Sequence, residues 1–178
     1  YDVRCTPVGV GSAPVSGSSG IVRPGGGNEG NGGMSDAEKI QQVEGSTKNG
    51  SSKSIQFDVT NTGDSPVTVQ NFSMSTPANN QGDVNDIVDY EEVEIDVDDG
   101  TDGSANDGFT TDNTHSLNQN AVIASGSSAG IYMGEFNDKI KIKYELTDAQ
   151  SSADIIVRLG YEDGSIGEFY FEVTDFKD

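Results

Sequence analysis

Tryptophan is absent from this chain of 178 residues, and cysteine and histidine occur once each. The single Cys5 excludes an intramolecular disulfide, and a lone cysteine is usually a small buried apolar side chain. The single His115 has no second histidine with which to share a metal ion. The chain also lacks a Gly-x-Ser-x-Gly elbow, a His-Glu-x-x-His pair and a phosphate-binding Gly-Lys-Ser/Thr loop. We therefore expect a non-enzymatic protein without a cofactor, in which His115 lies in solvent on a polar loop.

Basic residues are scarce, because ten Lys and Arg stand against thirty Asp and Glu, for a net charge of −20. A chain with so large a negative charge repels the phosphate groups of nucleic acids, so we expect no nucleic-acid partner. The acidic residues are spread through alternating apolar segments, as on the wet faces of strands. This pattern favours adaptation to concentrated salt, where the Debye length falls from about 10 Å at 0.1 M to about 3 Å at 1 M. An acidic solvated tail is the alternative.

Long apolar runs are also missing, and none could span a bilayer, so we expect no membrane insertion of this chain. The chain begins with Tyr1 and not with Met. A cleaved export signal explains both observations, although a trimmed chain would look the same. We expect a secreted or cell-surface protein.

Residues 1–33 differ in composition from the rest of the chain. They contain ten of the 23 glycines and carry no net charge. Two short apolar stretches, at 1–10 and 21–22, are separated and followed by Gly/Ser-rich linkers. We expect an extended N-terminal arm at 1–33 and a folded domain at 34–178.

The domain is expected to begin with a short helix. Ser35 and Glu38 form a capping-box pattern, in which each side chain can satisfy a free backbone N–H at a helix start. The predicted helix runs through Ile40 and Val43 and stops at Gly45, a residue type favoured after a helix end.

From residue 54 the apolar residues recur with a period of two, which predicts β-strands. Residues 55–59 and 67–74, joined by a turn, form a predicted β-hairpin. In the second strand, Val67, Val69, Asn71 and Ser73 are expected on one face and Phe72 and Met74 on the other. Further strands are expected at 90–97, 121–124, 130–136, 140–146, 153–161 and 167–176. Seven or eight strands with turn-rich connections predict an all-β fold, an antiparallel two-sheet Ig-like sandwich with one short helix.

The best candidate for cation binding is the acidic stretch 96–108. Its candidate ligands are Asp96, Asp98, Asp102 and Asp107. Hard cations such as Ca²⁺ take clustered oxygen ligands on a flexible loop. The stretch departs from an EF-hand loop, since Gly100 stands at a ligand position and Phe109 replaces the closing Glu. A loop that holds hydrated Na⁺ or K⁺ is the preferred interpretation.

Two short patterns are candidate acceptors for N-glycosylation. Asn49 begins Asn-Gly-Ser, and Asn71 begins Asn-Phe-Ser. The pattern is weak on its own, and it gains meaning only if the protein is exported. Asn49, in a Gly/Ser-rich stretch, is the better candidate.

Two segments carry a family resemblance. Residues 57–69, FDVTNTGDSPVTV, look like the first hairpin of Ig-like domains in exported haloarchaeal proteins. Residues 154–164, DIIVRLGYEDG, followed by 169–173, FYFEV, resemble the final strand pair of the same domains. Among these proteins the chain resembles the subunits of haloarchaeal fimbriae exported by the twin-arginine pathway. The resemblance implies a cofactor-free structural subunit that polymerises outside the cell, and it transfers no functional residue. Type IV-like archaeal pilins match less well, because their long apolar N-terminal helix is absent.

The arm suggests how such a subunit could polymerise. A sandwich that lacks one strand exposes unpaired N–H and C=O groups, which an extended segment of a neighbour can satisfy. The alternating candidate donor residues are Val3, Cys5, Val8 and Val10. We therefore hypothesise a subunit of an extracellular filament, a pilus or fimbria, of a halophilic archaeon, with copies of itself as partners.

Three alternatives stay open. The chain could be an Ig-like adhesion or cation-binding module, with the acidic region 83–112 as its contact. It could be a virion surface protein. The arm could also be a plain linker to an anchor or cell wall.

Overall fold

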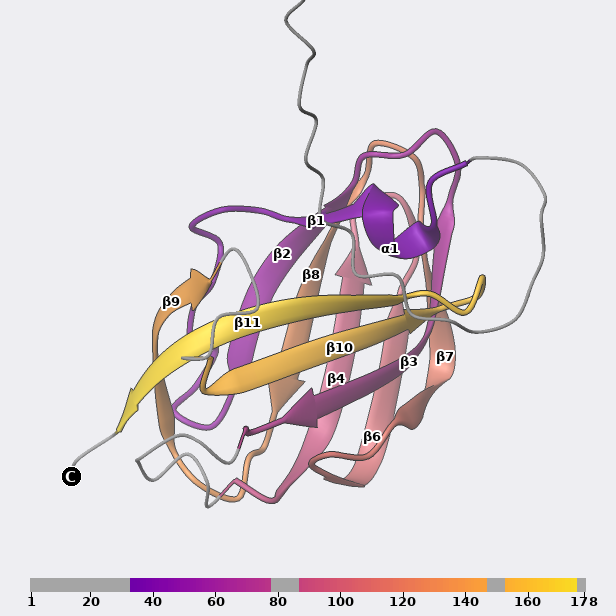
Figure 1. Ribbon diagram of the computed structural model, residues 1–178. Helices are drawn as coiled ribbons and strands as arrows, with labels where there is room; N and C mark the ends of the chain where they lie inside the picture. Colours follow the sequence, from indigo (N-terminus) through magenta and orange to yellow (C-terminus); the bar gives the residue numbers. More distant parts are fainter. Residues whose placement is uncertain (1–32, 78–86, 147–152, 176–178) are drawn as a thin grey trace, which may run out of the picture. The chain divides into compact units, whose positions relative to one another are not determined.

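A computed structural model of the chain describes residues 33–77, 87–146 and 153–175 (Figure 1). Its elements are α1 (Asp36–Lys39), β1 (Ile40–Gln42), β2 (Ile55–Asn61), β3 (Val67–Ser75), β4 (Asp89–Val97), β5 (Gly100–Thr101), β6 (Gly103–Thr110), β7 (His115–Ile123), β8 (Ser128–Gly134), β9 (Ile140–Leu146), β10 (Ile155–Tyr161) and β11 (Ile166–Asp175). All strand pairs among them are antiparallel, which confirms the predicted all-β class.

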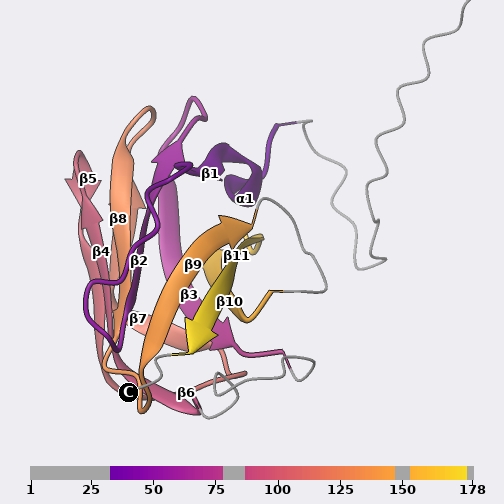
Figure 2. The same cartoon turned by 90° about the vertical axis from the view of Figure 1, so that its left-hand side faces the viewer.

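The strands form one sheet that curls into a nearly closed barrel (Figure 1 and Figure 2). Their hydrogen-bonded order is β1-β2-β8-β4-β6-β7-β3-β10-β11-β9, with β5 added to β7. The two halves of the sheet join where Ser104 of β6 pairs with Gln119 of β7. On the opposite side, the N–H of Ile140 in β9 donates to the carbonyl of Ser52 at 2.8 Å. Because hydrogen bonds continue from one half to the other, the predicted two-sheet Ig-like sandwich is not confirmed.

The predicted hairpin between β2 and β3 is wrong, although both strands exist. β2 pairs with β1 and β8, whereas β3 pairs with β7 and β10. The connection between them therefore crosses from one half of the sheet to the other. Asn61, which is fully buried, fixes this crossing, because its Nδ2 donates to the carbonyls of Ser65 at 2.9 Å and Ile123 at 3.0 Å. Its Oδ1 accepts a hydrogen bond from the N–H of Gly63.

A β-bulge in β3 changes which side chains face the core. Val69 and Asn71 lie opposite adjacent residues of β10, so Gln70 is the extra residue. An extra residue reverses the alternation of a strand. Phe72 and Met74 are therefore buried together with Val69, and the prediction that they face the other side is wrong.

The helix is shorter than predicted. The capping box of Ser35 and Glu38 is present, but α1 ends at Lys39 after a single turn. Ile40 is already extended and pairs with β2, and its side chain is buried. One helical turn forms few hydrogen bonds, and pairing with an existing strand offers more to the backbone. Val43, the predicted second apolar contact of the helix, is exposed.

The acidic stretch predicted as a loop is a β-hairpin. β4 extends to Val97, and β6 begins at Gly103 and pairs with β4. In β6 only Gly103, Ala105 and Phe109 are buried. So few apolar residues gave no visible periodicity, and for that reason this strand was missed.

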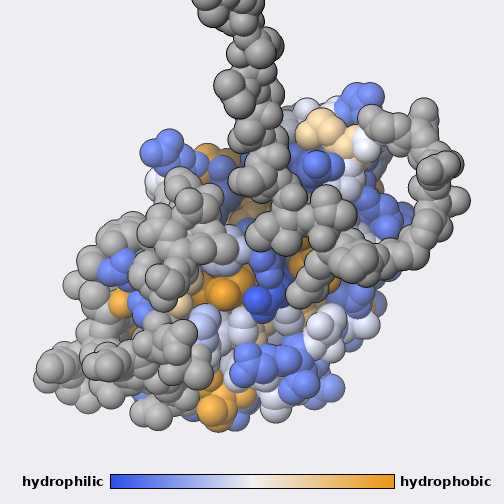
Figure 3. All heavy atoms as spheres, viewed as in Figure 1, coloured by the Kyte–Doolittle hydropathy of each residue, from blue (hydrophilic) through white to orange (hydrophobic). Residues whose placement is uncertain are grey.

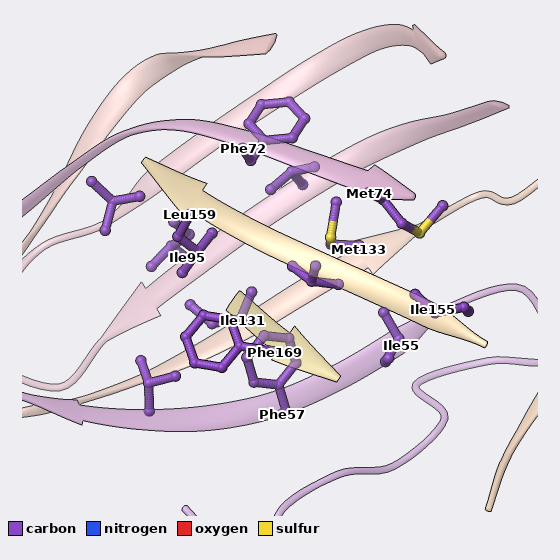
Figure 4. Packing of buried hydrophobic residues seen from close by; sticks show 14 of the residues in the cluster. Ile55, Phe57, Phe72, Met74, Ile95, Ile131, Met133, Ile155, Leu159 and Phe169 are labelled. Carbon is purple, nitrogen blue, oxygen red and sulfur yellow. The ribbon is translucent and has the colours of Figure 1, made fainter. Parts of the chain in front are cut away.

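The core fills the space between the two halves of the sheet (Figure 4). Side chains of β10 and β11 meet those of β2, β4 and β8 there. Phe57 of β2 contacts both Phe169 and Phe171 of β11, with ring centroids 5.0 Å apart in each case. No side chain of this cluster is more than 7 % exposed. Among the described residues, the core is thus closed to solvent.

The bulge provides a test of the fold. Deletion of Gln70 should turn either Phe72 and Met74 or Val67 and Val69 to the outside, since a shift of one residue exchanges the faces of a strand. We expect a loss of at least about 3 kcal/mol in the free energy of unfolding, the range seen when large core side chains are removed. Gln70→Ala keeps the bulge and should change stability by less than about 0.5 kcal/mol. Denaturant titrations in high salt measure both, and equal stability of the two variants would contradict the assignment.

Candidate functional site

The four candidate cation ligands lie on one exposed hairpin but do not converge. Asp96 belongs to β4 and Asp107 to β6, while Asp98 precedes β5 and Asp102 follows it. All four residues are exposed, and the carboxylate of Asp102 accepts a hydrogen bond from the N–H of Val97 at 2.9 Å. Within the described ranges, no three His, Cys, Asp or Glu side chains are grouped so that they could hold a metal ion. Cation binding at this hairpin stays a prediction.

The outer face of β2, β8, β4 and β6 is acidic. These four strands contain seven Asp and Glu residues and no Lys, Arg or His. Gly130 of β8 pairs with Asp58 on one side and with Asp96 on the other, so no side chain separates the two carboxylates. A hollow of about 410 Å³ lies there, and Val43 and Asp98 also line it. Such a face attracts cations or a basic partner.

His115 is not a loop residue in solvent, as the sequence predicted, but the half-buried first residue of β7. Its ring lies 5.1 Å from that of Phe109 and 5.8 Å from that of Phe72, measured between centroids. Its Nε2 is 3.0 Å from the carbonyl oxygen of Thr110. These contacts give His115 a structural role at the rim of the aromatic core. The polar residues around it in sequence concealed this role.

The two candidate glycosylation sites are engaged in hydrogen bonds. Nδ2 of Asn49 donates to the carbonyls of Ser54 at 3.1 Å and Ile140 at 3.3 Å. Asn71 lies within β3, and its Oδ1 accepts a hydrogen bond from Ser116 at 3.0 Å. A glycan on the nitrogen of Asn49 would compete with both of its bonds, so the folded state does not present Asn49 as a free acceptor.

A second hollow, of about 160 Å³, lies over Gly160 in the other half of the sheet. Ile166, which is 60 % exposed, forms part of its wall. Arg158 also lines it, but its guanidinium is bound to Glu168 and to Ser75, each at 2.7 Å. The hollow therefore offers an apolar wall rather than a free charge. Figure 3 shows this side of the barrel, over β10 and β11, where small apolar areas lie among hydrophilic residues.

The turn between β10 and β11 anchors the start of the domain. The N–H of Asp36 donates to Oδ2 of Asp163 at 2.8 Å, and the N–H of Ala37 donates to Oγ of Ser165 at 3.0 Å. Burial favours the neutral form of Asp163, but the hydrogen bonds from Asp36 and Ser165 prevail and lower its pKa. The chain therefore enters the barrel at a fixed place. No local pattern in the sequence indicates this contact, which joins residues 127 positions apart.

The outer edge of β2, next to the first end of the sheet, is covered along its length. β1 covers Val59, Thr60 and Asn61 of β2. Further along β2, the carbonyl of Asp58 accepts a hydrogen bond from the N–H of Val43 at 2.9 Å. Gln56 exchanges two hydrogen bonds with the backbone of residue 48, at 2.8 and 2.9 Å. β2 therefore offers little to a further strand.

Comparisons with known proteins do not identify a relative. Protein families, curated proteins and solved structures all gave no match to the chain. The resemblance to haloarchaeal fimbrial subunits therefore stays a prediction, as does the export route. Within the described part of the chain, no helix is long and apolar enough to cross a membrane.

The candidate donor residues Val3, Cys5, Val8 and Val10 lie outside the described residues. The predicted boundary between arm and domain, at residues 33 and 34, falls where the description begins.

The acidic face predicts that folding depends on salt. Alternate residues of a strand are about 7 Å apart, less than the Debye length of about 10 Å at 0.1 M but more than about 3 Å at 1 M. Repulsion between Glu94 and Asp96 should therefore be strong in dilute salt only. The double variant Glu94→Gln, Asp96→Asn should fold at a lower NaCl concentration than the original chain.

Circular dichroism during dialysis from 3 M to 0.05 M NaCl measures the midpoint, the NaCl concentration at which half of the protein is folded. The matched control is Glu44→Gln with Glu162→Gln, which removes the same charge from exposed residues outside the four acidic strands. The control should shift the midpoint less. A spectrum of the original chain that does not change over this range of salt would refute the prediction.

Proposed function

We propose that this protein is a structural subunit of an extracellular filament, a pilus or fimbria, of a halophilic archaeon. Each subunit donates its N-terminal arm as a β-strand to the next subunit. The observation that supports the proposal is the way the sheet ends. The core of the barrel is buried, but the last strand of the sheet, β9, pairs with only one other described strand, β11. A sheet end of this kind is where an extended segment of another chain can add.

The arm has the composition of a donor. Residues 1–33 carry no net charge, whereas the whole chain has a net charge of −20. The arm is therefore not repelled by a second copy, as an acidic segment of the chain would be. Their apolar residues alternate within 1–10, and a glycine-rich tether of ten residues, 24–33, reaches roughly 30 Å when extended. The contact is heterologous, so it repeats from copy to copy and builds a fibre when the rotation between copies does not close into a ring.

The energetics require backbone pairing. Ordering about ten residues costs roughly 10–20 kcal/mol, at 1–2 kcal/mol each. Burial of four apolar side chains contributes about 6–12 kcal/mol, at 1.5–3 kcal/mol each. The remainder must come from inter-strand hydrogen bonds, at about 0.5–1.5 kcal/mol each. A donated arm therefore needs a free strand edge, and an apolar hollow alone would not hold it.

The charge distribution supports a saline, extracellular setting for such a filament. Seven acidic residues and no basic ones lie on β2, β8, β4 and β6. In molar salt their repulsion is screened, and the hydrated carboxylates keep the filament surface soluble. No catalytic role is proposed, because His115, the only histidine, is packed against aromatic rings.

One observation favours a second candidate function. The hollow around Gly130, flanked by Asp58 and Asp96, suits a cation or a basic group of another molecule. An Ig-like adhesion or cation-binding module of a surface protein, or of a virion, would use such a face and would stay monomeric at high concentration. The filament subunit would assemble under the same conditions, so electron microscopy in 3 M NaCl separates the two.

The double variant Val8→Asp, Val10→Asp tests the proposed function. Two unpaired charges would enter the contact with the next subunit, and their desolvation opposes strand addition. We expect soluble monomers with an unchanged circular dichroism spectrum. Negative-stain microscopy and size-exclusion chromatography in 3 M NaCl measure the assembly state.

The matched control is Ser12→Asp with Ser16→Asp. It adds the same two charges to the arm but leaves the alternating apolar residues intact, so it should still form filaments. Filaments of normal length from the Val8/Val10 variant would refute strand donation.

A further inference from the structure

We infer that β9 is the acceptor of the donated arm and that residues 1–10 of a second copy add to its free edge. This inference rests on the proposed function and specifies the partner site for it. The sheet of the described residues has only two ends, β1 and β9. The choice between them follows from how each end is closed.

The β1 end offers only a short edge to a further strand. β1 has three residues, and the next groups of β2 are already bonded to the segment that follows β1. The N–H of Asp58 donates to Oγ of Ser46 at 2.9 Å, and its carbonyl accepts from Val43. Very short edge strands are a common way in which proteins prevent strand addition.

Among the described residues, the β9 end is bonded to the rest of the chain at its first residue. β9 has seven residues, and all but one of them are paired with residues of β11 on one side. On its other side, the N–H of Ile140 donates to Ser52 at 2.8 Å, and its carbonyl accepts from Asn49 at 3.3 Å. Alternate residues of a strand point their backbone groups the same way, so Ile142 presents its N–H and C=O toward that same side. Within the described residues β9 has no second strand there. Figure 2 looks onto this terminal strand.

The composition of the arm supports it as the occupant. β9 contains Lys141, Lys143 and Glu145, which give it a net charge of +1. Residues 1–10 contain one Asp, one Arg and no Lys, so they carry no net charge. The arm therefore approaches this edge without net repulsion.

The contact is an addition to an edge rather than the filling of a groove. Ile140, Phe169 and Phe171, which lie on or beside β9, are at most 5 % exposed in the subunit alone. The described side chains beside β9 therefore form no open apolar groove for the donor. Affinity then depends on backbone pairing with β9. Val8 and Val10 of the arm add contacts on one face of the new strand, and Val3 and Cys5 add contacts on the other.

Photo-crosslinking of the full-length chain tests this inference. The photoreactive residue p-benzoylphenylalanine replaces Lys141 in β9 or, as the matched control at the other sheet end, Gln41 in β1. Each probe protein assembles with an excess of isotopically labelled unmodified chain in 3 M NaCl. Mass spectrometry then identifies labelled peptides joined to the probe. A third variant carries the probe at Lys143. It replaces the Lys141 variant if the probe at Lys141 itself prevents assembly.

We expect the β9 probes to capture residues 1–10 of a labelled copy at least ten times more often than the β1 probe does. If filaments form but the β1 probe captures residues 1–10 as often as the β9 probes do, or more often, the choice of β9 is wrong. The proposed filament function would not be affected by that result. If the unmodified chain forms no filaments, both the filament function and the acceptor assignment fail.

Discussion

Backbone hydrogen bonding around the barrel is the constraint on which the rest of the structure depends. A linear antiparallel sheet leaves a row of unpaired N–H and C=O groups at each end, and only full closure removes both. In this chain the two ends approach each other at Ile140 and Ser52, and among the described strands β9 pairs only with β11. The first end is covered by the chain itself. The unequal closure of the two ends is what makes a directional contact between copies physically reasonable.

The sequence was sufficient for the fold class but not for the topology. Alternation of apolar residues revealed β2, β4 and β10, because their inward residues are aliphatic or aromatic. The same alternation predicts β9 and β11. It missed β6, in which glycine and alanine fill most inward positions, and it could not reveal the bulge at Gln70. The turn residues after Asn61 predict a hairpin, because such residues look the same whether the next strand pairs locally or crosses the barrel.

The candidate site was less predictable than the fold, for a similar reason. The acidic residues of 96–108 suggested a cation loop, but strand pairing spreads them over a hairpin on which all four candidate ligands are exposed. His115 and Asp163 act through partners distant in sequence, Phe72 and Asp36. Contacts of this kind depend on the path of the chain, which no local pattern specifies. What composition did supply is the contrast between a neutral arm and an anionic domain, and the proposed assembly depends on it.

Amide hydrogen exchange of β9 tests the central claim most directly. Exchange of residues 140–146 is compared between unassembled and assembled chain in 3 M NaCl, with residues 40–42 of β1 as the internal reference. If a donated arm pairs with β9, its amides should exchange at least ten times more slowly in the assembled state, because new hydrogen bonds must open before exchange. The β1 amides should not change. Equal exchange of β9 in both states would contradict the account.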